Sequence, residues 1–250
     1  SLGPAHQYLS KPCAAEVLKA TIERAYALRR LMNCTTFKKL VSQIEALPSL
    51  PSLYQDLVNE LRKKTPALGA LARIIAQDIG MSANTLKLVN SAYFGSFEAV
   101  TSVERAVTCL GLETINDLLR IEIFFEYSGP EVSGFSLEAL CRHSTVTAAY
   151  ARTIAGLEEP DGGLATRASQ AGMLHDVGNL ILAGSMSERY GRVLQRASER
   201  KAPISEIEKE ELGATHSQIG AYLIGLWGLP EPIVEAIAYH ERPAECPQPG

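Results

Sequence analysis

The chain has 250 residues, of which 46% are hydrophobic and 21% are charged, and its formal net charge is −4. This length and composition are typical of a globular protein with a substantial core, and they exclude a disordered chain. The slight negative charge argues against general binding to nucleic acid or to a membrane, since either would need a basic patch. No apolar run approaches the roughly 18–20 residues of a membrane span, and the N-terminus lacks a signal-peptide pattern.

The cysteines are scattered, odd in number and never arranged as a C-x-x-C pair. We interpret them as reduced thiols and therefore expect a cytoplasmic protein. The five are Cys13, Cys34, Cys109, Cys141 and Cys246.

The first 36 residues predict a fragment of a domain. Gln7–Leu9 resembles a short strand, Lys11 and Pro12 follow it, and a helix with one apolar stripe is predicted from about Ala14 to Leu31. One strand and one helix cannot bury a core. We therefore expect residues 1–36 to be the end of a domain that is truncated upstream, together with a linker helix.

From Phe37 onward the patterns are helical, and no alternating β pattern follows residue 12. Gly80 is predicted to end one helix and Ser82 to begin the next. The turn-rich segment 128–134 predicts a boundary between two helical lobes, 37–130 and 131–250. The fold class is therefore all-α after the N-terminal strand. The expected helices span about 52–64, 66–78, 82–91, 103–110, 113–127, 136–155, 164–175, 179–183, 187–200, 205–212, 215–227 and 230–240.

Four of the five histidines lie in apolar helical segments, and Asp176 directly follows one of them. Imidazole and carboxylate groups bind zinc, iron and manganese, and inward-facing histidines from several helices build metal sites in helical bundles. A lone histidine on an apolar face is more often a hydrogen-bonded core residue, so both interpretations stay open. Spacing predicts that all four face the packed interior: His143, His175, His216 and His240.

Residues 102–124 could be taken for a helix-turn-helix motif that binds DNA. The second helix carries Glu113 and Asp117 against the single cation Arg120, whereas phosphate neutralisation needs the opposite sign. We therefore expect this helix to pack in the core, with no nucleic-acid contact.

Eight short motifs, in their order and spacing, resemble the HDOD domain family over roughly residues 37–245. The resemblance implies an all-α fold with two lobes and a signalling output role, in a family related to the HD superfamily of metal-dependent phosphohydrolases. By this resemblance, His143, His175, Asp176, His216 and His240 fall where HD-type enzymes bind their metal. The motifs are Leu47–Pro51, Ile74–Ser82, Leu88–Gly95, Ser102–Gly111, His143–Ser144, Gly172–Gly178, His216–Leu223 and Trp227–Pro230.

The N-terminal piece resembles the last strand and helix of a response-regulator receiver domain. By that resemblance Lys11 would contact the phosphoryl group and Pro12 would follow a cis peptide bond. The resemblance implies a two-component phosphorelay, with a cognate sensor kinase acting through the missing part of the receiver domain and with other signalling proteins as partners. A homodimer stays open as an assembly.

Two departures from the catalytic HD pattern favour a non-catalytic output module. Asn179 stands where cyclic-dinucleotide phosphodiesterases usually carry a lysine, and the expected Gly-Tyr-Pro motif after Glu241 is missing. We expect regulated protein–protein contact as the function. The alternative is a phosphohydrolase acting on a nucleotide or cyclic dinucleotide through iron, manganese or zinc, and a sensor of nucleotide or metal also stays open.

Overall fold

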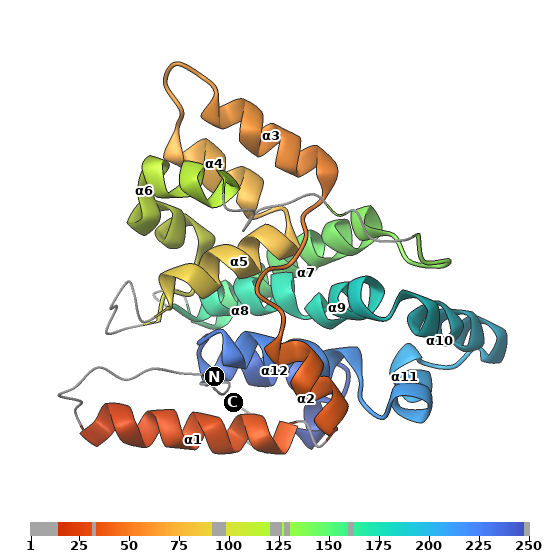
Figure 1. The fold of residues 1–250 in the computed structure, drawn as a ribbon. Coiled ribbons are helices and arrows are strands. Elements are labelled where there is room, and N and C mark those ends of the chain that lie inside the picture. The colour runs from red at the N-terminus through yellow and green to blue at the C-terminus, as the bar shows by residue number, and fades with distance from the viewer. Residues whose placement is uncertain are drawn as a thin grey trace, which may run out of the picture.

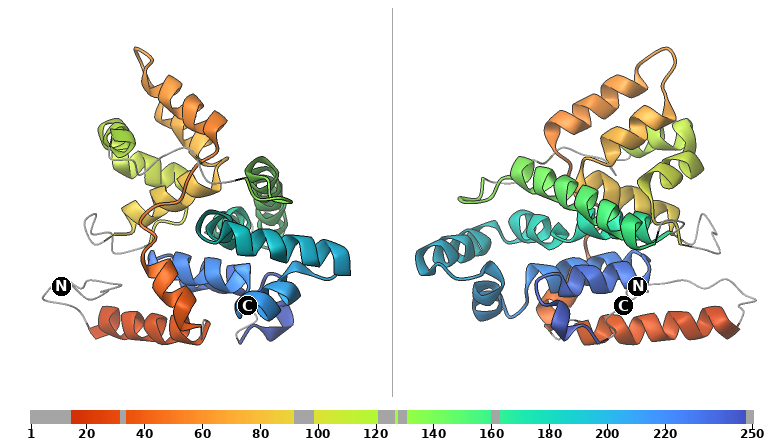
Figure 2. Two further views of the ribbon diagram at one scale, coloured as in Figure 1. Left: turned by 45° about the vertical axis from the view of Figure 1, so that its right-hand side comes forward. Right: turned by 180° about the vertical axis from the view of Figure 1, so that it is seen from behind.

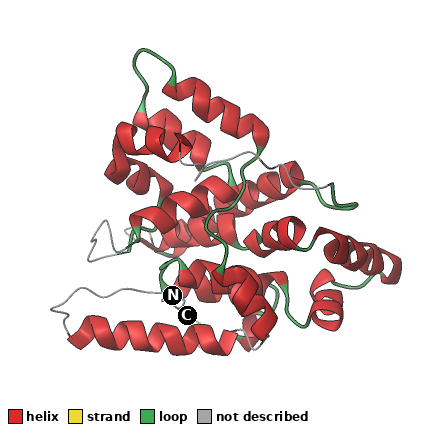
Figure 3. Cartoon of the chain, viewed as in Figure 1, coloured by secondary structure: helices red, strands yellow, loops and turns green. Residues whose placement is uncertain are grey.

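The computed structural model of the chain describes residues 15–31, 34–91, 99–120, 127, 131–159 and 163–247. Their secondary structure is helical (Figures 1 and 3). The helices are α1 (Ala15–Leu31), α2 (Thr35–Ser42), α3 (Pro51–Leu61), α4 (Leu68–Ile75), α5 (Ile79–Val89), α6 (Val103–Arg120), α7 (Leu137–Glu158), α8 (Gly163–Leu174), α9 (Val177–Ser185), α10 (Ser187–Arg200), α11 (Ile204–Leu212), α12 (His216–Leu226), α13 (Glu231–Tyr239) and the 3-10 turn η1 (Pro243–Glu245).

The all-α prediction is confirmed. Within the described ranges no strand occurs, and the nearest feature is an isolated bridge at Ser49, whose carbonyl accepts a hydrogen bond from the backbone N–H of Tyr127. The predicted strand Gln7–Leu9 lies outside the described residues. No helix in the described part of the chain is long and apolar enough to cross a membrane.

Two apolar cores hold the molecule together. The smaller one joins α3, α4, α5 and α6 through residues such as Leu57, Leu71 and Ile115, and α3, α4 and α6 lie at the top of Figure 1. The larger core joins α8, α9, α12 and α13 with helices that pack around them, and it includes Leu174, Leu180 and Leu223. Because α5 contributes residues to both cores, it connects the two groups of helices.

The start of α5 corrects one sequence prediction. Gly80 was expected to end a helix and Ser82 to begin the next, but both lie inside α5. Asp78 is the N-cap, since its buried carboxylate accepts hydrogen bonds from the backbone N–H groups of Met81 and Leu50. Packing requires a glycine at position 80, because a Cβ there would lie 2.1 Å from the carbonyl oxygen of Pro48.

The predicted glycine turn at Gly111 is confirmed as a sharp kink within α6. Gly111 has φ 75° and ψ 170°, a conformation that disfavours residues with a Cβ. Ile115 and Leu118 after the kink are buried, as the core-packing interpretation of this helix predicts.

α7 and α8 pack side by side along much of their length (Figure 2). At their crossing, a Cβ on Gly172 would lie 2.9 Å from the Cα of Ala148, so only glycine permits this approach. The close contact brings the start of α7, which carries His143, near the end of α8, which precedes His175.

α9 and α12 also meet through glycines. A Cβ on Gly178 would lie 1.9 Å from the carbonyl oxygen of His216, and one on Gly220 would lie 2.9 Å from the backbone nitrogen of Gly178. The first turn of α12 therefore rests directly on the first turn of α9. This contact fixes the position of His216 relative to Asp176.

We predict that Gly178→Ala destabilises the protein, since the added methyl group must push α9 away from the His216 carbonyl. The free energy of unfolding should fall by at least about 2 kcal/mol, measured by urea denaturation. Gly184→Ala is the matched control in the same helix, because a Cβ there meets no atom within 4 Å. The control should be neutral or more stable by ~0.5–1 kcal/mol, and equal losses in both variants would contradict the packing argument.

Candidate metal centre

His175 and Asp176 form the turn between α8 and α9. The apolar run that ends α8 buries Met173 and Leu174, and His175 is buried directly after them. Asp176 occupies the N-cap position of α9, but its side chain accepts no capping hydrogen bond from that helix. The carboxylate faces the histidines instead.

The structure brings four imidazoles from separate helices to this one carboxylate. Oδ2 of Asp176 lies 3.2 Å from Nε2 of His175 and 3.8 Å from Nε2 of His143. Oδ1 lies 3.4 Å from Nε2 of His216 and 3.7 Å from Nε2 of His240. The five residues that the sequence singled out therefore form one cluster, with Asp176 at its middle.

Hydrogen bonds on the far side of three rings fix which nitrogen faces Asp176. Nδ1 of His175 lies 2.8 Å from the carbonyl oxygen of Gly172, and Nδ1 of His240 lies 2.8 Å from that of Ile237. A carbonyl oxygen only accepts, so each Nδ1 must carry a proton and donate it. The Nε2 atom of each ring therefore faces the centre, and when it is deprotonated its lone pair is available to a metal, which is how metal-binding histidines are oriented. Burial opposes protonation of His175, but the hydrogen bond and charge of Asp176 outweigh it and raise the pKa of His175.

His216 is oriented by a carboxylate. Its Nδ1 and its backbone N–H both lie 2.8 Å from Oε2 of Glu208, which is fully buried. This is the carboxylate–histidine arrangement that accompanies many metal ligands. Oε1 of Glu208 has no hydrogen-bond partner among the described residues.

His143 corrects a prediction. The sequence placed it on the packed face of its helix, but its side chain is 60% exposed. The buried face of α7 instead carries Leu140, Cys141 and Ser144. His143 stands at the rim of the centre, and its Nε2 lies 3.2 Å from Nε2 of His175. It thus reaches the cluster from the solvent side.

The cluster shifts the pKa values of its members. Burial opposes ionisation of Asp176, but hydrogen bonds and charge from His175 and His216 outweigh it and hold the pKa of Asp176 well below its usual range. Burial likewise opposes protonation of His216, but Asp176 and Glu208 outweigh it and raise the pKa of His216 to about 10. Burial lowers the pKa of His240. Without a metal, His216 therefore carries a proton at neutral pH.

The donor geometry fits divalent metal ions. Four ligands about 2.1 Å from one ion in a tetrahedral arrangement are separated from each other by about 3.4 Å. The separations of 3.2–3.8 Å around Asp176 match that spacing. The ligating atoms form two groups, each within 4.8 Å, that share Asp176: one with His143 and His175, the other with His216 and His240. Imidazole and carboxylate donors suit iron, manganese and zinc.

Asn179 occupies the position of the expected lysine and carries no positive charge. Its Oδ1 accepts a hydrogen bond of 2.8 Å from the hydroxyl group of Tyr190, which is buried. Among the described residues, Asp176 forms no ion pair with a lysine or arginine. Asn179 therefore supplies no positive charge that could neutralise a transferring phosphoryl group.

Two acidic residues of the centre were missed by sequence reasoning. Glu208 lies in a strongly charged helix, yet it shares a face with the buried Ser205 and Leu212, and that spacing was the available signal. Oε2 of Glu241 lies 4.0 Å from Nε2 of His216. No helical spacing in the sequence marked this residue as part of the centre. Lys11 and Pro12, the other predicted site residues, lie outside the described residues.

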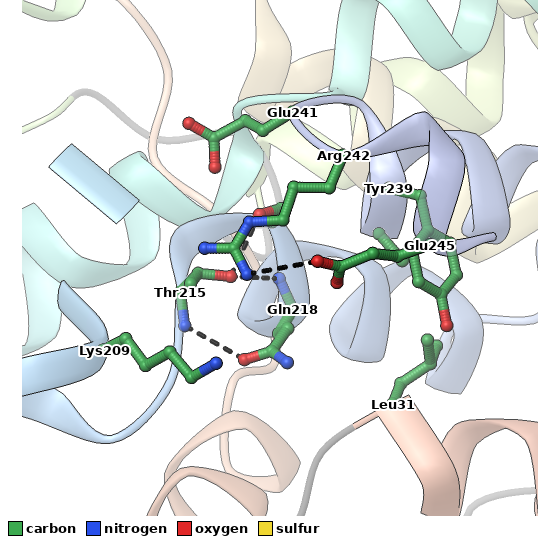
Figure 4. A pocket seen from close by; sticks show the side chains of 10 residues that line it. Leu31, Lys209, Thr215, Gln218, Tyr239, Glu241, Arg242 and Glu245 are labelled. Carbon is green, nitrogen blue, oxygen red and sulfur yellow. Dashed lines mark hydrogen bonds and ion pairs between the residues drawn. The ribbon is translucent and has the colours of Figure 1, made fainter. Parts of the chain in front are cut away.

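A pocket of about 250 Å³ lies beside the centre and shares Glu241 with it (Figure 4). Lys209 and Arg242 enter it from opposite sides, and Thr215 and Gln218 form its floor through a reciprocal capping box at the start of α12. Glu241 and Glu245 also line the pocket, and Nη1 of Arg242 lies 3.7 Å from Oε1 of Glu245, so the two cations stand among two carboxylates.

The fold and the centre define an all-α protein with a histidine–aspartate cluster between its helices. The family model of the HDOD domain matches residues 47–243, which is most of the chain. The chain therefore belongs to the HDOD domain family.

Three similar proteins were found, and the two solved structures among them support the fold. An uncharacterized protein of Treponema pallidum (strain Nichols) is 26% identical over 236 residues, which are 91% of this chain and 45% of that protein. The chain thus spans less than half the length of this curated relative. The MmoQ response regulator of Methylococcus capsulatus str. Bath has a TM-score of 0.66 at 23% identity, covering 77% of this chain and 75% of its own. A virulence factor of Campylobacter jejuni has a TM-score of 0.67 at 20% identity, covering 84% and 75%.

We predict that metal-free protein loses stability in alkali through His216. A histidine whose folded pKa is raised stabilises the fold fully below its unfolded pKa of about 6.5, and this contribution is lost as the pH rises through about 10. Between pH 7 and 10 the free energy of unfolding of the parent should therefore fall by a few kcal/mol more than that of His216→Gln. Urea denaturation with a chelator present measures both values.

His240→Gln is the control for this measurement. The pKa of His240 is lowered, so its protonation contributes no stability that could be lost above pH 7. The parent and His240→Gln should show parallel pH profiles in alkali. Parallel profiles for the parent and His216→Gln would contradict the raised pKa.

Proposed function

We propose that this chain is a signal-output domain whose histidine–aspartate centre binds divalent metal ions. The observation that carries the proposal is the convergence of four Nε2 atoms on both oxygens of Asp176. A core histidine is satisfied by one hydrogen bond at each ring nitrogen, from separate partners. Here three rings have satisfied Nδ1 atoms and all direct Nε2 to the same carboxylate. That arrangement supports metal binding over ordinary core packing.

In this proposal each residue of the centre has a defined role. Asp176, His143 and His175 would hold one ion, and Asp176, His216 and His240 would hold a second. Gly172, Glu208 and Ile237 hold the rings in the binding tautomer. A bound divalent ion would supply Lewis acidity and would lower the pKa of a coordinated water.

The residues around the candidate metal ligands support a signalling role through protein–protein contact rather than through catalysis. Asn179 contributes no charge and is already hydrogen-bonded to Tyr190. Without a cation at that position, the centre is better suited to holding ions than to stabilising a transferring phosphoryl group. The protein would then act by changing the surface that it presents to a partner.

The linker helix α1 offers a route for an upstream signal. Leu28 of α1 is buried against α12, where a Cβ on Gly225 would lie 2.1 Å from its Cδ2. α12 begins with His216, so a shift of α1 would be transmitted through one rigid helix to the centre. This route fits a response regulator in a two-component phosphorelay, with a sensor kinase acting on an upstream receiver domain.

A metal-dependent phosphohydrolase is the second candidate. It is favoured by the sharing of Asp176 between two groups of three ligands, since three protein ligands leave coordination positions open on each ion. In the neighbouring pocket Lys209 could bind the anionic part of a nucleotide or cyclic dinucleotide, whereas Arg242 there already pairs with Glu245. Release of 4-nitrophenol from bis(4-nitrophenyl) phosphate by manganese- or iron-loaded protein would support this candidate over contact output.

We predict a metal content that changes in steps. The parent, loaded with manganese, iron or zinc and then desalted, should hold two ions per chain by inductively coupled plasma mass spectrometry. His143→Gln should retain one, because it removes a ligand of the first ion only. Asp176→Asn should retain none, because it weakens the ligand that both ions share.

Asp56→Asn is the control for this series, since Asp56 is an exposed carboxylate on α3, remote in sequence from the centre. It should match the parent in metal content. Circular dichroism checks that each variant is folded. A metal content near zero in the folded parent under every loading condition would refute metal binding.

A further inference from the structure

A second pocket lies between the two groups of helices, and no residue of the histidine centre lines it. Its volume is about 250 Å³. Residues of α5 and α6 form one wall, and residues of α7 and α8 form the other. In Figure 1, α6 lies above α8. A molecule in this pocket would therefore contact both groups of helices at once.

One buried polar side chain of this pocket has an unmet hydrogen-bond donor. Gln170 lines the pocket and is only 6% exposed. Among the described residues, its Nε2 has no hydrogen-bond partner. A buried amide donor without a partner destabilises the fold, so it needs an acceptor from elsewhere. The terminal amide of a glutamine turns over a broad range, and an acceptor held in the pocket can therefore reach it.

Two opposite charges stand on the two walls. Arg152 of α7 and Glu104 of α6 both line the pocket. Both are exposed, and in the described part of the chain neither forms an ion pair. A simple anion would pair with Arg152 but would leave the Glu104 carboxylate beside it without compensation. A ligand that carries both charges would satisfy both side chains with charge-assisted hydrogen bonds.

The hydroxyl groups of the pocket extend this pattern to both walls. Oγ of Ser102 accepts a hydrogen bond from the backbone N–H of Arg105, so its own proton is left to donate. Oγ1 of Thr145 donates to the carbonyl oxygen of Cys141, so its lone pairs are left to accept. Each wall thus offers both a donor and an acceptor. This fits a compact ligand whose ammonium and carboxylate groups lie close together.

The rest of the described lining is aliphatic and small. No aromatic side chain belongs to it, so a nucleobase would find no stacking surface among these residues. The volume also lies below the roughly 300–1,000 Å³ of sites for drug-sized ligands. A short aliphatic side chain suits this space. The apolar lining residues are Ala76, Val103, Ala148, Ala149 and Met173.

We propose that the pocket between α6 and α8 binds a small aliphatic α-amino acid. Its carboxylate would accept hydrogen bonds from Gln170 and Arg152, and its ammonium group would face Glu104. The inference does not depend on metal binding by the histidine centre.

Binding at this place would act on the arrangement of the helices. Val103 belongs to the smaller core and Met173 to the larger one, and both line the pocket. A bound amino acid would therefore favour the arrangement in which α6 lies against α8. The pocket would serve as an input through which the concentration of a metabolite reaches a signalling domain.

Isothermal titration calorimetry on the full chain, dialysed free of small molecules, tests the proposal. The probes are alanine, valine, leucine, isoleucine and methionine, each titrated alone. At least one should bind at one site per chain, with a dissociation constant of about 10 μM to 1 mM. Its amine analogue without the carboxylate and its carboxylic-acid analogue without the ammonium group should each bind at least about tenfold more weakly.

Substitutions at the two charges test the orientation of the ligand. Arg152→Gln and Glu104→Gln should each raise the dissociation constant about tenfold. Arg142→Gln on α7 and Glu113→Gln on α6 are the matched controls, since both residues are exposed and lie outside the pocket lining. Both controls should bind the amino acid as the parent does.

Gln170→Leu separates a binding role from a structural one. It removes the unpartnered amide, so the variant should unfold at a urea concentration no lower than the parent. It should nevertheless lose binding of the amino acid. Because stability is measured independently, a loss of binding in this folded variant cannot be ascribed to unfolding.

Three results would each overturn the proposal. The first is the absence of saturable heat with all five amino acids up to about 10 mM. The second is binding of acetate or inorganic phosphate as tight as that of the best amino acid, which would indicate an anion site only. The third is an unchanged affinity in Gln170→Leu.

Discussion

The carboxylate of Asp176 is the constraint on which the centre depends. A carboxylate at the first turn of a helix would ordinarily cap that helix, but this one accepts no such bond and is surrounded by four imidazoles. A buried charge needs compensating partners. The helices that carry the histidines must therefore be held at fixed distances from α9. The glycine contacts at Gly172 and Gly178 allow that approach, because any Cβ there would collide with a neighbouring backbone.

Much of this arrangement could be predicted from the sequence. Helical periodicity located most of the helices, and Ser136 and Thr215 marked the starts of α7 and α12 correctly. The inward position of His175 and His216 followed from apolar spacing and is confirmed by their burial. His143 was assigned wrongly because α7 has apolar residues on both faces, so spacing alone could not select the buried one. The structure resolves this ambiguity through the contact between α7 and α8.

Other features depend on contacts between distant segments. Glu208 lies among charged residues, and its role as partner of His216 depends on the turn between α11 and α12, which brings the two side chains within 2.8 Å. Gly80 looked like a helix terminus because a glycine of that kind often is one. Position 80 requires a glycine because the carbonyl group of Pro48, which is far away in the sequence, leaves no room for a Cβ. Close approaches of this kind are set by tertiary packing and leave no periodic signal.

Anomalous X-ray diffraction from crystals of manganese- or zinc-loaded protein tests the central claim most directly. We expect two anomalous peaks, one between Asp176, His143 and His175 and the other between Asp176, His216 and His240. No peak at either position in fully loaded crystals, with the histidines hydrogen-bonded only to one another and to Asp176, would contradict it.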